Sequence, residues 1–203
     1  SVWVVGYGAA LTQFATVSVN MSMHQMIIAR LHAGLGMAVA AVAVPSTIPL
    51  LRSDFVQLTR DGAGGVWVAG STTGQLRFDG VTVAPRSPGT DVDGFVARYS
   101  RACVYHEGRY FGTASDDVVT AAVAAKTNGV AVAFNTLAPS VAIDLMTYNS
   151  WDSDGVGRMG MLVVFERNVG AVAMRAVDAG SGIDGDIRAM SVSCENGGWS
   201  NLH

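Results

Sequence analysis

The hexapeptide GVWVAG at residues 65–70 decides the fold, because the chain repeats it at a fixed interval. Nearly the same string, SVWVVG, stands 64 residues earlier at residues 1–6. A third copy, GVAVAF, begins 64 residues later and occupies residues 129–134, and a degenerate fourth begins at Gly198. Self-similarity at a fixed period is typical of repeat architectures, in which each unit buries its surface against its neighbours.

The segments that flank these strings repeat as well. Each string follows a polar turn and a strand-like segment with an Asp in front of it, and the three segments are residues 55–60, 118–123 and 187–192, preceded by Asp54, Asp117 and Asp186. Further strand-like segments lie downstream at a matching phase, at residues 27–30, 95–98 and 162–165. The sequence therefore predicts one repeat domain over residues 1–203, with units of about 1–64, 65–128 and 129–197 and the start of a fourth at 198.

The units have the character of β structure. In the middle unit, four short segments are rich in Val, Thr and aromatic residues, as strands are: residues 66–71, 76–83, 94–99 and 118–123. Asp-Gly and Asn-Gly pairs separate such segments and tolerate the positive φ of tight turns. Residues 26–44 are rich in Ala and Met, yet their counterparts in the other units are strand-like, so we expect two strands joined at residues 32–36.

About four strands per 64-residue unit predict an all-β fold of antiparallel β-propeller blades. Three such units make a partial propeller or half of a ring, since propellers close with about four to eight blades. Trp3, Trp67 and Trp199 share one repeat phase, so we expect one buried Trp per blade.

Composition narrows the class of protein further. Half of the residues are hydrophobic and 14% are charged, against roughly 25% charged in an average soluble domain, which excludes a disordered chain. A net charge of −3 argues against a nucleic-acid-binding surface. The longest apolar run, residues 35–45, is shorter than the ~20 residues of a membrane helix, so we expect no membrane span.

The middle unit resembles a known family. DGAGGVWVAGS at residues 61–71 is similar to the D-x-x-G-N-x-Y-V-x-G-x pattern of bacterial β-propeller repeats of the SBBP type. Residues 76–83 and 93–99 continue the resemblance, which is close in sequence over residues 61–100. The other units share mainly the spacing of the strand-like segments and few of the residues. It implies a propeller, often in secreted or cell-surface proteins, and it implies no catalytic residues.

Two arrangements of three units remain open. The chain is either a segment of a longer propeller or one of two copies that assemble head to tail into six blades, as closed rings allow. In both cases the open sheet edges of an isolated three-unit chain would be covered.

The strongest candidate ligand-binding residues are Trp151, Asp152 and Asp154, because aromatic side chains beside carboxylates suit contacts with sugars or peptides. Asp152-Ser153-Asp154-Gly155 is similar to the start of a calcium loop, but no Glu follows to close it, so a solvated turn is favoured. We predict no metal site, since the four histidines, His24, His32, His106 and His203, have no metal-ligand spacing.

Two further clusters receive structural interpretations. His106-Glu107 with Arg109 and Tyr110 could form a small polar site, but an exposed hairpin is favoured. Asp116-Asp117 is interpreted as an anchoring turn whose carboxylates accept backbone N–H bonds, in preference to a pair of general acid/base carboxylates. Whether Cys103 and Cys194 form a disulfide stays open.

The functional hypothesis is a non-catalytic module that binds a protein or a carbohydrate through loops on one propeller face, without a cofactor, outside the cell or at its surface. The first alternative is a hydrolase or lyase with its site at the central channel. The sequence contains no G-x-S-x-G, H-E-x-x-H or P-loop string. Several blades could nevertheless assemble a catalytic site together, so the absence of these motifs does not exclude an enzyme. The second is a structural subunit of a ring or filament.

Overall fold

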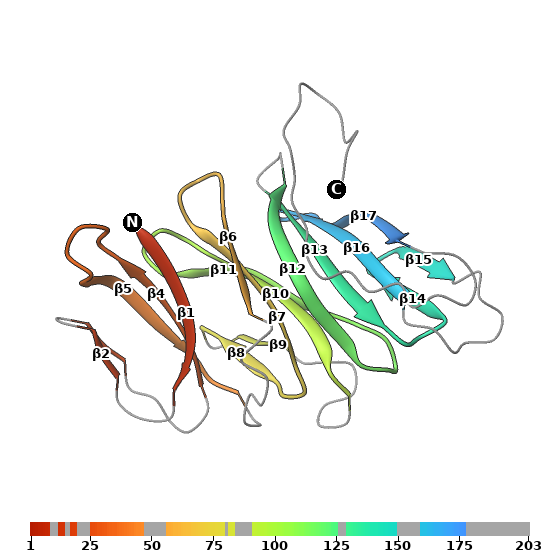
Figure 1. The fold of residues 1–203 in the computed structure, drawn as a ribbon, viewed down its shortest axis with the longest axis horizontal. Helices are drawn as coiled ribbons and strands as arrows, with labels where there is room; N and C mark the ends of the chain where they lie inside the picture. Colours follow the sequence, from red (N-terminus) through yellow and green to blue (C-terminus); the bar gives the residue numbers. More distant parts are fainter. Residues whose placement is uncertain are drawn as a thin grey trace.

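The computed structural model describes residues 1–8, 12–14, 17–19, 25–46, 56–79, 81–83, 91–125, 129–149 and 159–177. All regular structure within these ranges is antiparallel β, and none of it is helical, so the all-β prediction is confirmed. Three main sheets lie side by side in chain order (Figure 1). Within the same ranges, no helix has the length and apolar character needed to traverse a lipid bilayer.

Sheet 2, in the middle, is a four-stranded meander. Its strands, in spatial order, are β6 (Gln57–Arg60), β7 (Val66–Thr72), β10 (Asp93–Tyr99) and β11 (Tyr105–Phe111). Between β7 and β10 the chain forms a small hairpin of β8 (Leu76–Phe78) and β9 (Val81–Val83). Residues 76–83 were expected as one strand; the structure divides them because Asp79 turns the chain with a φ of +47°.

Sheet 3 repeats this plan. Its main strands are β12 (Asp117–Ala125), β13 (Gly129–Thr136), β16 (Met159–Glu166) and β17 (Gly170–Val177), and its inserted hairpin is β14 (Ser140–Ile143) with β15 (Met146–Asn149). Sheet 1 contains β1 (Val2–Gly8), β4 (Gln25–Leu31) and β5 (Ala38–Val44), with the hairpin β2 (Thr12–Phe14) and β3 (Val17–Val19). The two strands expected within residues 26–44 are therefore confirmed as β4 and β5.

The three repeated strings occupy one place in the three sheets. They form β1, β7 and β13, each of which directly precedes the inserted hairpin and pairs with the strand that follows it. The register makes Ile27, Phe95 and Met161 equivalent, since their partners are Gly6, Gly70 and Phe134. The sequence alignment had matched Leu162 with Phe95, an error of one residue that would reverse every side chain between the two faces of the strand.

Sheet 2 is buried on both faces, so all residues of β7 and β10 are buried. Side chains on one face pack against sheet 1 in a cluster that includes Met26, Ile28, Val44, Val66, Val68, Phe95 and Tyr99. Side chains on the other face pack against sheet 3 in a cluster that includes Trp67, Ala69, Val96, Phe111, Val130, Val132, Phe134 and Val163. Because side chains alternate along a strand, burial of both faces requires the unbroken apolar runs seen in the sequence.

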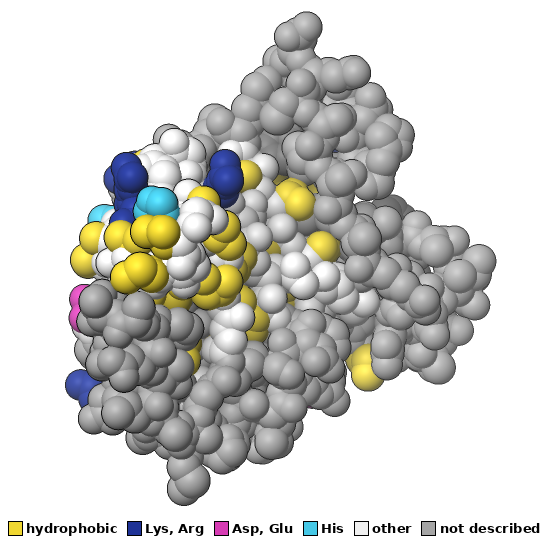
Figure 2. Space-filling view, turned by 60° about the vertical axis from the view of Figure 1, so that its left-hand side comes forward, with side chains coloured by type: hydrophobic (Ala, Val, Ile, Leu, Met, Phe, Trp, Pro, Cys, Tyr) yellow, Lys and Arg dark blue, Asp and Glu magenta, His cyan; other side chains and the backbone are white. Residues whose placement is uncertain are grey.

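The outer face of sheet 1 is also apolar. Ile27 and Ala29 are buried there, and Val4, Leu31, Ala41 and Ala43 pack around them as partly buried residues. Val2, on the same face as Val4, is 50% exposed. Figure 2 turns this side of the molecule forward and shows hydrophobic side chains gathered on it. By position, this face corresponds to the face of sheet 2 that packs on sheet 1.

The expectation of one buried Trp per unit has a mixed outcome. Trp67 is buried in the cluster between sheets 2 and 3. Trp3 occupies the equivalent place between sheets 1 and 2 but is partly exposed beside a pocket. Trp199 lies outside the described residues. Cys103 is buried with a free thiol, and Cys194 also lies outside the described residues.

Asp117 fastens sheet 3 to sheet 2, as the anchoring-turn interpretation predicted. Its Oδ2 accepts hydrogen bonds from the backbone N–H of Thr113 at 2.6 Å and from the Thr113 hydroxyl at 3.0 Å. Asp116 Oδ1 accepts the Val92 N–H at 3.0 Å, and the Val119 N–H is donated to Ser71 Oγ at 2.7 Å. Burial raises the pKa of Asp117 from 3.8 to about 6, although the two hydrogen bonds that its carboxylate accepts from Thr113 oppose the shift.

This pKa predicts a specific dependence of stability on pH. Between pH 4 and 6 the folded protein keeps a proton on Asp117 that the unfolded chain has lost, so the free energy of unfolding falls as pH rises through this window. The fall due to Asp117 is on the order of 2–3 kcal/mol. Urea unfolding of the parent and of Asp117→Asn between pH 4 and 7.5 measures it, because the other groups titrate in both proteins. A stability difference that does not change with pH would contradict the assignment.

Candidate binding site

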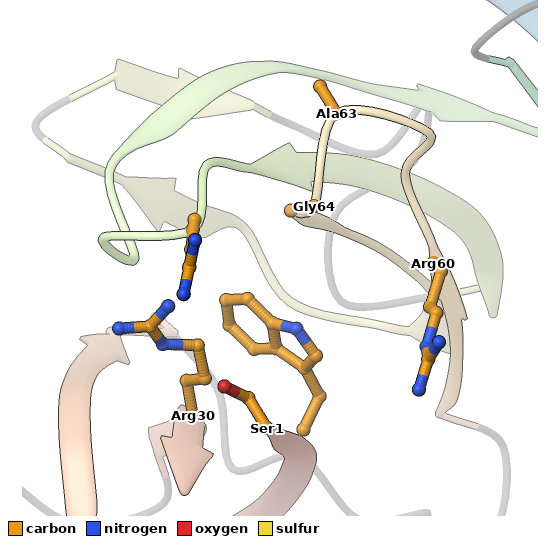
Figure 3. A pocket seen from close by; sticks show the side chains of 8 residues that line it. Ser1, Arg30, Arg60, Ala63 and Gly64 are labelled. Carbon is orange, nitrogen blue, oxygen red and sulfur yellow. The ribbon is translucent and has the colours of Figure 1, made fainter. Parts of the chain in front are cut away.

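An open pocket with a volume of about 280 Å³ lies where sheet 1 meets the turns at one end of sheet 2. Its lining comes from both sheets: Ser1, Trp3 and Arg30 from sheet 1, and Arg60, Ala63, Gly64, Gly65 and Arg101 from sheet 2. Figure 3 shows Arg30 beside Ser1, with Ala63 and Gly64 across from them. Arg60, at the end of the neighbouring strand, lies farther from Arg30.

Strand register explains why these side chains meet. Trp3 on β1 and Arg30 on β4 are directly paired, so both point from the same face of sheet 1 toward sheet 2. Arg60 is the last residue of β6, and Ala63 and Gly64 belong to the turn that leads into β7. Arg101 belongs to the turn between β10 and β11. Sheet 2 therefore lines the pocket with the end of β6, the turn before β7 and the turn after β10.

The pocket is strongly cationic. Three arginines line it, and none of the lining residues that the structure describes is acidic. Arg60 and Arg101 are exposed, whereas only 9% of Arg30 is exposed. Among the described residues, neither Nε nor Nη1 of Arg30 has a hydrogen-bond partner. A buried guanidinium stays protonated and is costly without a counter-charge, so this arrangement favours an anion.

The neighbouring Cys103 does not neutralise Arg30. Its thiol lies near the Arg30 backbone and charge, which favour the thiolate, but burial has the larger effect and raises the pKa of the thiol above its usual value of 9.0. Cys103 is therefore uncharged at neutral pH, and the positive charge of Arg30 remains available to a ligand.

The next sheet contains the same Trp–Arg pair with its charge compensated. Arg98 is paired with Trp67, as Arg30 is with Trp3, and its Cζ lies 6.0 Å from the centre of the Trp67 ring. Asp61 Oδ2 accepts from Arg98 Nε at 2.9 Å and lies 2.8 Å from Nη2. Glu107 Oε1 lies 3.5 Å from Nη1. Arg98 thus has two carboxylates and is 2% exposed.

Sheet 1 differs at the place of one of these carboxylates. The partner of Arg98 on β11 is Glu107, but the partner of Arg30 on β5 is Ala40. The pocket around Arg30 is therefore a carboxylate site without its carboxylate. Such a site can bind and orient an anionic group through charge-assisted hydrogen bonds.

The residues predicted from sequence lie elsewhere. Trp151, Asp152 and Asp154 lie outside the described residues, as do His24 and His203. His32 and His106 are exposed. The described residues contain no group of three or more His, Cys, Asp or Glu placed to hold a metal ion.

The polar segment at residues 106–110 lies on β11, the outer strand of the β10–β11 hairpin, and several of its side chains contact other segments. Glu107 Oε2 accepts the Asn168 N–H of sheet 3 at 2.9 Å. Arg109 Nη1 donates to Asp144 Oδ2 at 3.0 Å. Tyr110 donates its hydroxyl hydrogen to the Gly74 carbonyl at 2.6 Å. The hairpin interpretation is therefore confirmed in part: the segment is the outer strand of a hairpin and His106 is exposed, but Glu107, Arg109 and Tyr110 are only partly exposed and contact other segments.

Sequence reasoning missed Arg30, although a signal was present. The repeated segments IIAR and FVAR, at residues 27–30 and 95–98, place Arg30 and Arg98 at one phase. A comparison of their surroundings would have shown an acidic residue at 107 and Ala at 40. The necessary pairing of β4 with β5 and of β10 with β11 came only from the structure.

The sequence matches no known family model, and a search of curated proteins finds no match either. The resemblance of residues 61–100 to bacterial propeller repeats therefore stays a prediction.

Removing a carboxylate from Arg98 and removing the charge of Arg30 itself should have opposite effects on stability. Asp61→Asn keeps the turn geometry but removes a carboxylate from buried Arg98, so we expect a loss of about 3 kcal/mol in the free energy of unfolding. Arg30→Met removes an uncompensated buried charge and should leave stability unchanged or raise it. Urea unfolding measures both. A double variant, Asp61→Asn with Arg98→Met, is the control and should recover most of the loss; equal losses in Arg30→Met and Asp61→Asn would contradict this account.

Proposed function

We propose that the protein is a non-catalytic interaction module that binds an acidic side chain of a protein partner in the pocket around Arg30. The observation that carries the proposal is the contrast between two equivalent arginines. Arg98 is compensated by Asp61 and Glu107, whereas the buried Nε and Nη1 of Arg30 have no described partner. A carboxylate from outside would give Arg30 the coordination that Arg98 already has.

The chemistry of the pocket favours a protein ligand over a neutral carbohydrate. Sugar hydroxyls could hydrogen-bond to Arg30 and stack on Trp3, but they would leave its charge uncompensated in a buried position. An Asp or Glu side chain supplies both the charge and a pair of oxygens that match the guanidinium. Arg60 and Arg101 at the exposed rim would strengthen the attraction and speed the encounter.

We further infer that the three sheets are consecutive blades of a β-propeller. Two observations support this inference: the sheets share one strand plan with an inserted hairpin, and they stack through equivalent faces in the same direction. The apolar outer face of sheet 1 suits a further unit, from a second copy or from a longer chain. The resemblance to SBBP-type repeats agrees with this architecture, and with it we propose a secreted or cell-surface location.

The binding of N-acetylaspartate tests the proposed function. At a ligand concentration ten times Kd, the free energy of unfolding should rise by about 1.4 kcal/mol, which raises Tm by roughly 3–6 °C for a chain of this size. Thermal unfolding monitored by circular dichroism measures the shift. A control ligand without any carboxylate, N-acetylasparagine methylamide, should produce little shift, because it cannot compensate Arg30.

Two variants make this test specific. Arg30→Gln should abolish the shift, whereas Arg77→Gln removes an exposed arginine outside the pocket and should retain it. If the parent shows no shift, or if Arg30→Gln shows the same shift as the parent, the pocket is not the binding site.

A further inference from the structure

Three equivalent turns present apolar side chains to solvent. Each turn joins the last two main strands of its sheet: residues 32–37 lie between β4 and β5, residues 100–104 between β10 and β11, and residues 167–169 between β16 and β17. Leu35 is 68% exposed, Val104 51% and Val169 68%. Turns are usually polar, so an exposed aliphatic residue at the same place in all three sheets is a recurring feature rather than an isolated one.

A basic residue accompanies the aliphatic one in each turn. His32, Arg101 and Arg167 are all exposed, and residues 32–37, 100–104 and 167–169 include no acidic residue. Asp61 and Glu107, close by on sheet 2, are already engaged by Arg98. On the face that Figure 2 turns forward, Arg and His side chains lie beside hydrophobic ones. The turns therefore combine apolar surface with positive charge.

Contacts between the sheets bring neighbouring turns together. Arg101 of the second turn lines the same pocket as Arg30, which stands just before the first turn. Asn168 of the third turn donates its backbone N–H to Glu107 at 2.9 Å, and Glu107 follows shortly after the second turn on β11. The three turns thus form a row across the three sheets, and we call residues 32–37, 100–104 and 167–169 the turn row.

Hydrogen bonds hold the backbone of the turn row in place. In the first turn, the Gly36 N–H donates to the His32 carbonyl at 3.0 Å. In the second, the Val104 N–H donates to Ser100 Oγ at 3.2 Å, and the third is fixed by the bond from Asn168 to Glu107. The exposed aliphatic side chains project from an ordered backbone, so little conformational entropy remains to be lost when a partner binds them.

The chemistry of the turn row fits an anionic lipid surface. Aliphatic side chains on separate turns can enter the boundary between headgroups and acyl chains, while the cations beside them attract anionic headgroups. A soluble anion would pair with the cations but leave Leu35, Val104 and Val169 in water. The row contains no Phe, Tyr or Trp, the residues that anchor most protein interfaces. A membrane therefore matches both properties of the row better than a protein does.

We propose that the turn row docks the protein peripherally on a membrane that contains anionic phospholipids. Leu35, Val104 and Val169 lie at the depth of the headgroups, and Arg101 and Arg167 contact lipid phosphates. Binding is reversible, because three aliphatic side chains bury little area in comparison with a spanning helix. The proposal goes beyond the proposed function, since it does not depend on the charge of Arg30.

Sedimentation of the full chain with lipid vesicles tests the proposal. One set of vesicles consists of phosphatidylcholine alone, and a second contains about 30% phosphatidylserine. We expect the protein to bind the phosphatidylserine vesicles about tenfold or more tightly than the neutral ones, because two arginines of the row face the lipid charge. Raising the ionic strength should weaken this preference.

Substitutions within the turn row should weaken binding to the phosphatidylserine vesicles. Leu35→Ser should do so about tenfold, because the apolar side chain no longer leaves water. Arg167→Gln should do so roughly fivefold, because one contact with anionic lipid is lost. Both residues are exposed, so circular dichroism should show unchanged folding.

Matched controls lie outside the turn row. Leu137 is 48% exposed and follows β13 at the opposite end of the strands, so Leu137→Ser should bind like the parent. Arg77→Gln removes an exposed arginine from the β8–β9 hairpin and should also bind like the parent. Arg30→Gln should retain vesicle binding even though it removes the cation that the proposed function requires.

A tryptophan at the first turn gives a second measurement. The fluorescence of Leu35→Trp should shift to shorter wavelength when phosphatidylserine vesicles are added, beyond any shift of the parent. The proposal is wrong if the parent binds neither kind of vesicle, if it binds both equally, or if Leu35→Ser and Leu137→Ser lose the same affinity. It is also wrong if Arg30→Gln alone abolishes binding, or if the row mediates association between copies of the chain and no vesicle binding occurs.

Discussion

The central strands of sheet 2, β7 and β10, have no face in contact with water, because sheet 1 covers one side and sheet 3 covers the other. Both the odd and the even positions of β7 and β10 must then be apolar or closely matched in charge, which explains why half of the chain is hydrophobic and only 14% is charged. A charge can enter such an interface only with a partner, as Arg98 does with Asp61 at 1% side-chain exposure. The same constraint makes Arg30 conspicuous, since it lies at the equivalent place and its Nε and Nη1 have no hydrogen-bond partner in the part of the chain that the structure describes.

One position of the repeat has reached three different states. In sheet 2, two carboxylates neutralise the charge of Arg98, and Arg98 and its partner Trp67 are both buried. In sheet 3 the corresponding pair is Ala131–Val164, which is apolar and needs no charge. In sheet 1 the Trp3–Arg30 pair keeps the cation, and Ala40 stands where sheet 2 has Glu107. Repetition provides the scaffold, and divergence at one position produces the candidate site.

The architecture was largely readable from the sequence, because burial of both faces enforces a visible pattern. The strings on β1, β7 and β13 are conspicuous since every residue of such a strand must be apolar or small. The offset of β16 was misjudged by one residue, because an apolar run such as MGMLVVFE does not show which of its side chains face which neighbour. Residues 76–83 were expected as one strand although Asp79-Gly80 is one of the turn-forming Asp-Gly pairs, and Asp79 adopts a φ of +47° there.

The site was harder to predict than the fold. Trp151, Asp152 and Asp154 were chosen because they combine an aromatic ring with carboxylates in a polar stretch. Arg30 stands inside an apolar strand and gives no such local signal. Its importance comes from pairing with Ala40 rather than with an acidic residue, and that pairing joins segments separated by a turn. Absent partners become visible only when equivalent positions of a repeat are compared in three dimensions.

The most direct test of this account restores the missing charge within the chain. Ala40→Glu places a carboxylate opposite Arg30, as Glu107 stands opposite Arg98. Urea unfolding of the parent, Ala40→Glu, Arg30→Gln and the double variant forms a double-mutant cycle that isolates the interaction between positions 30 and 40. The account predicts that Ala40→Glu stabilises the protein by about 1–3 kcal/mol when Arg30 is present and does not do so when it is absent. An equal effect in both backgrounds would show that Arg30 needs no anion.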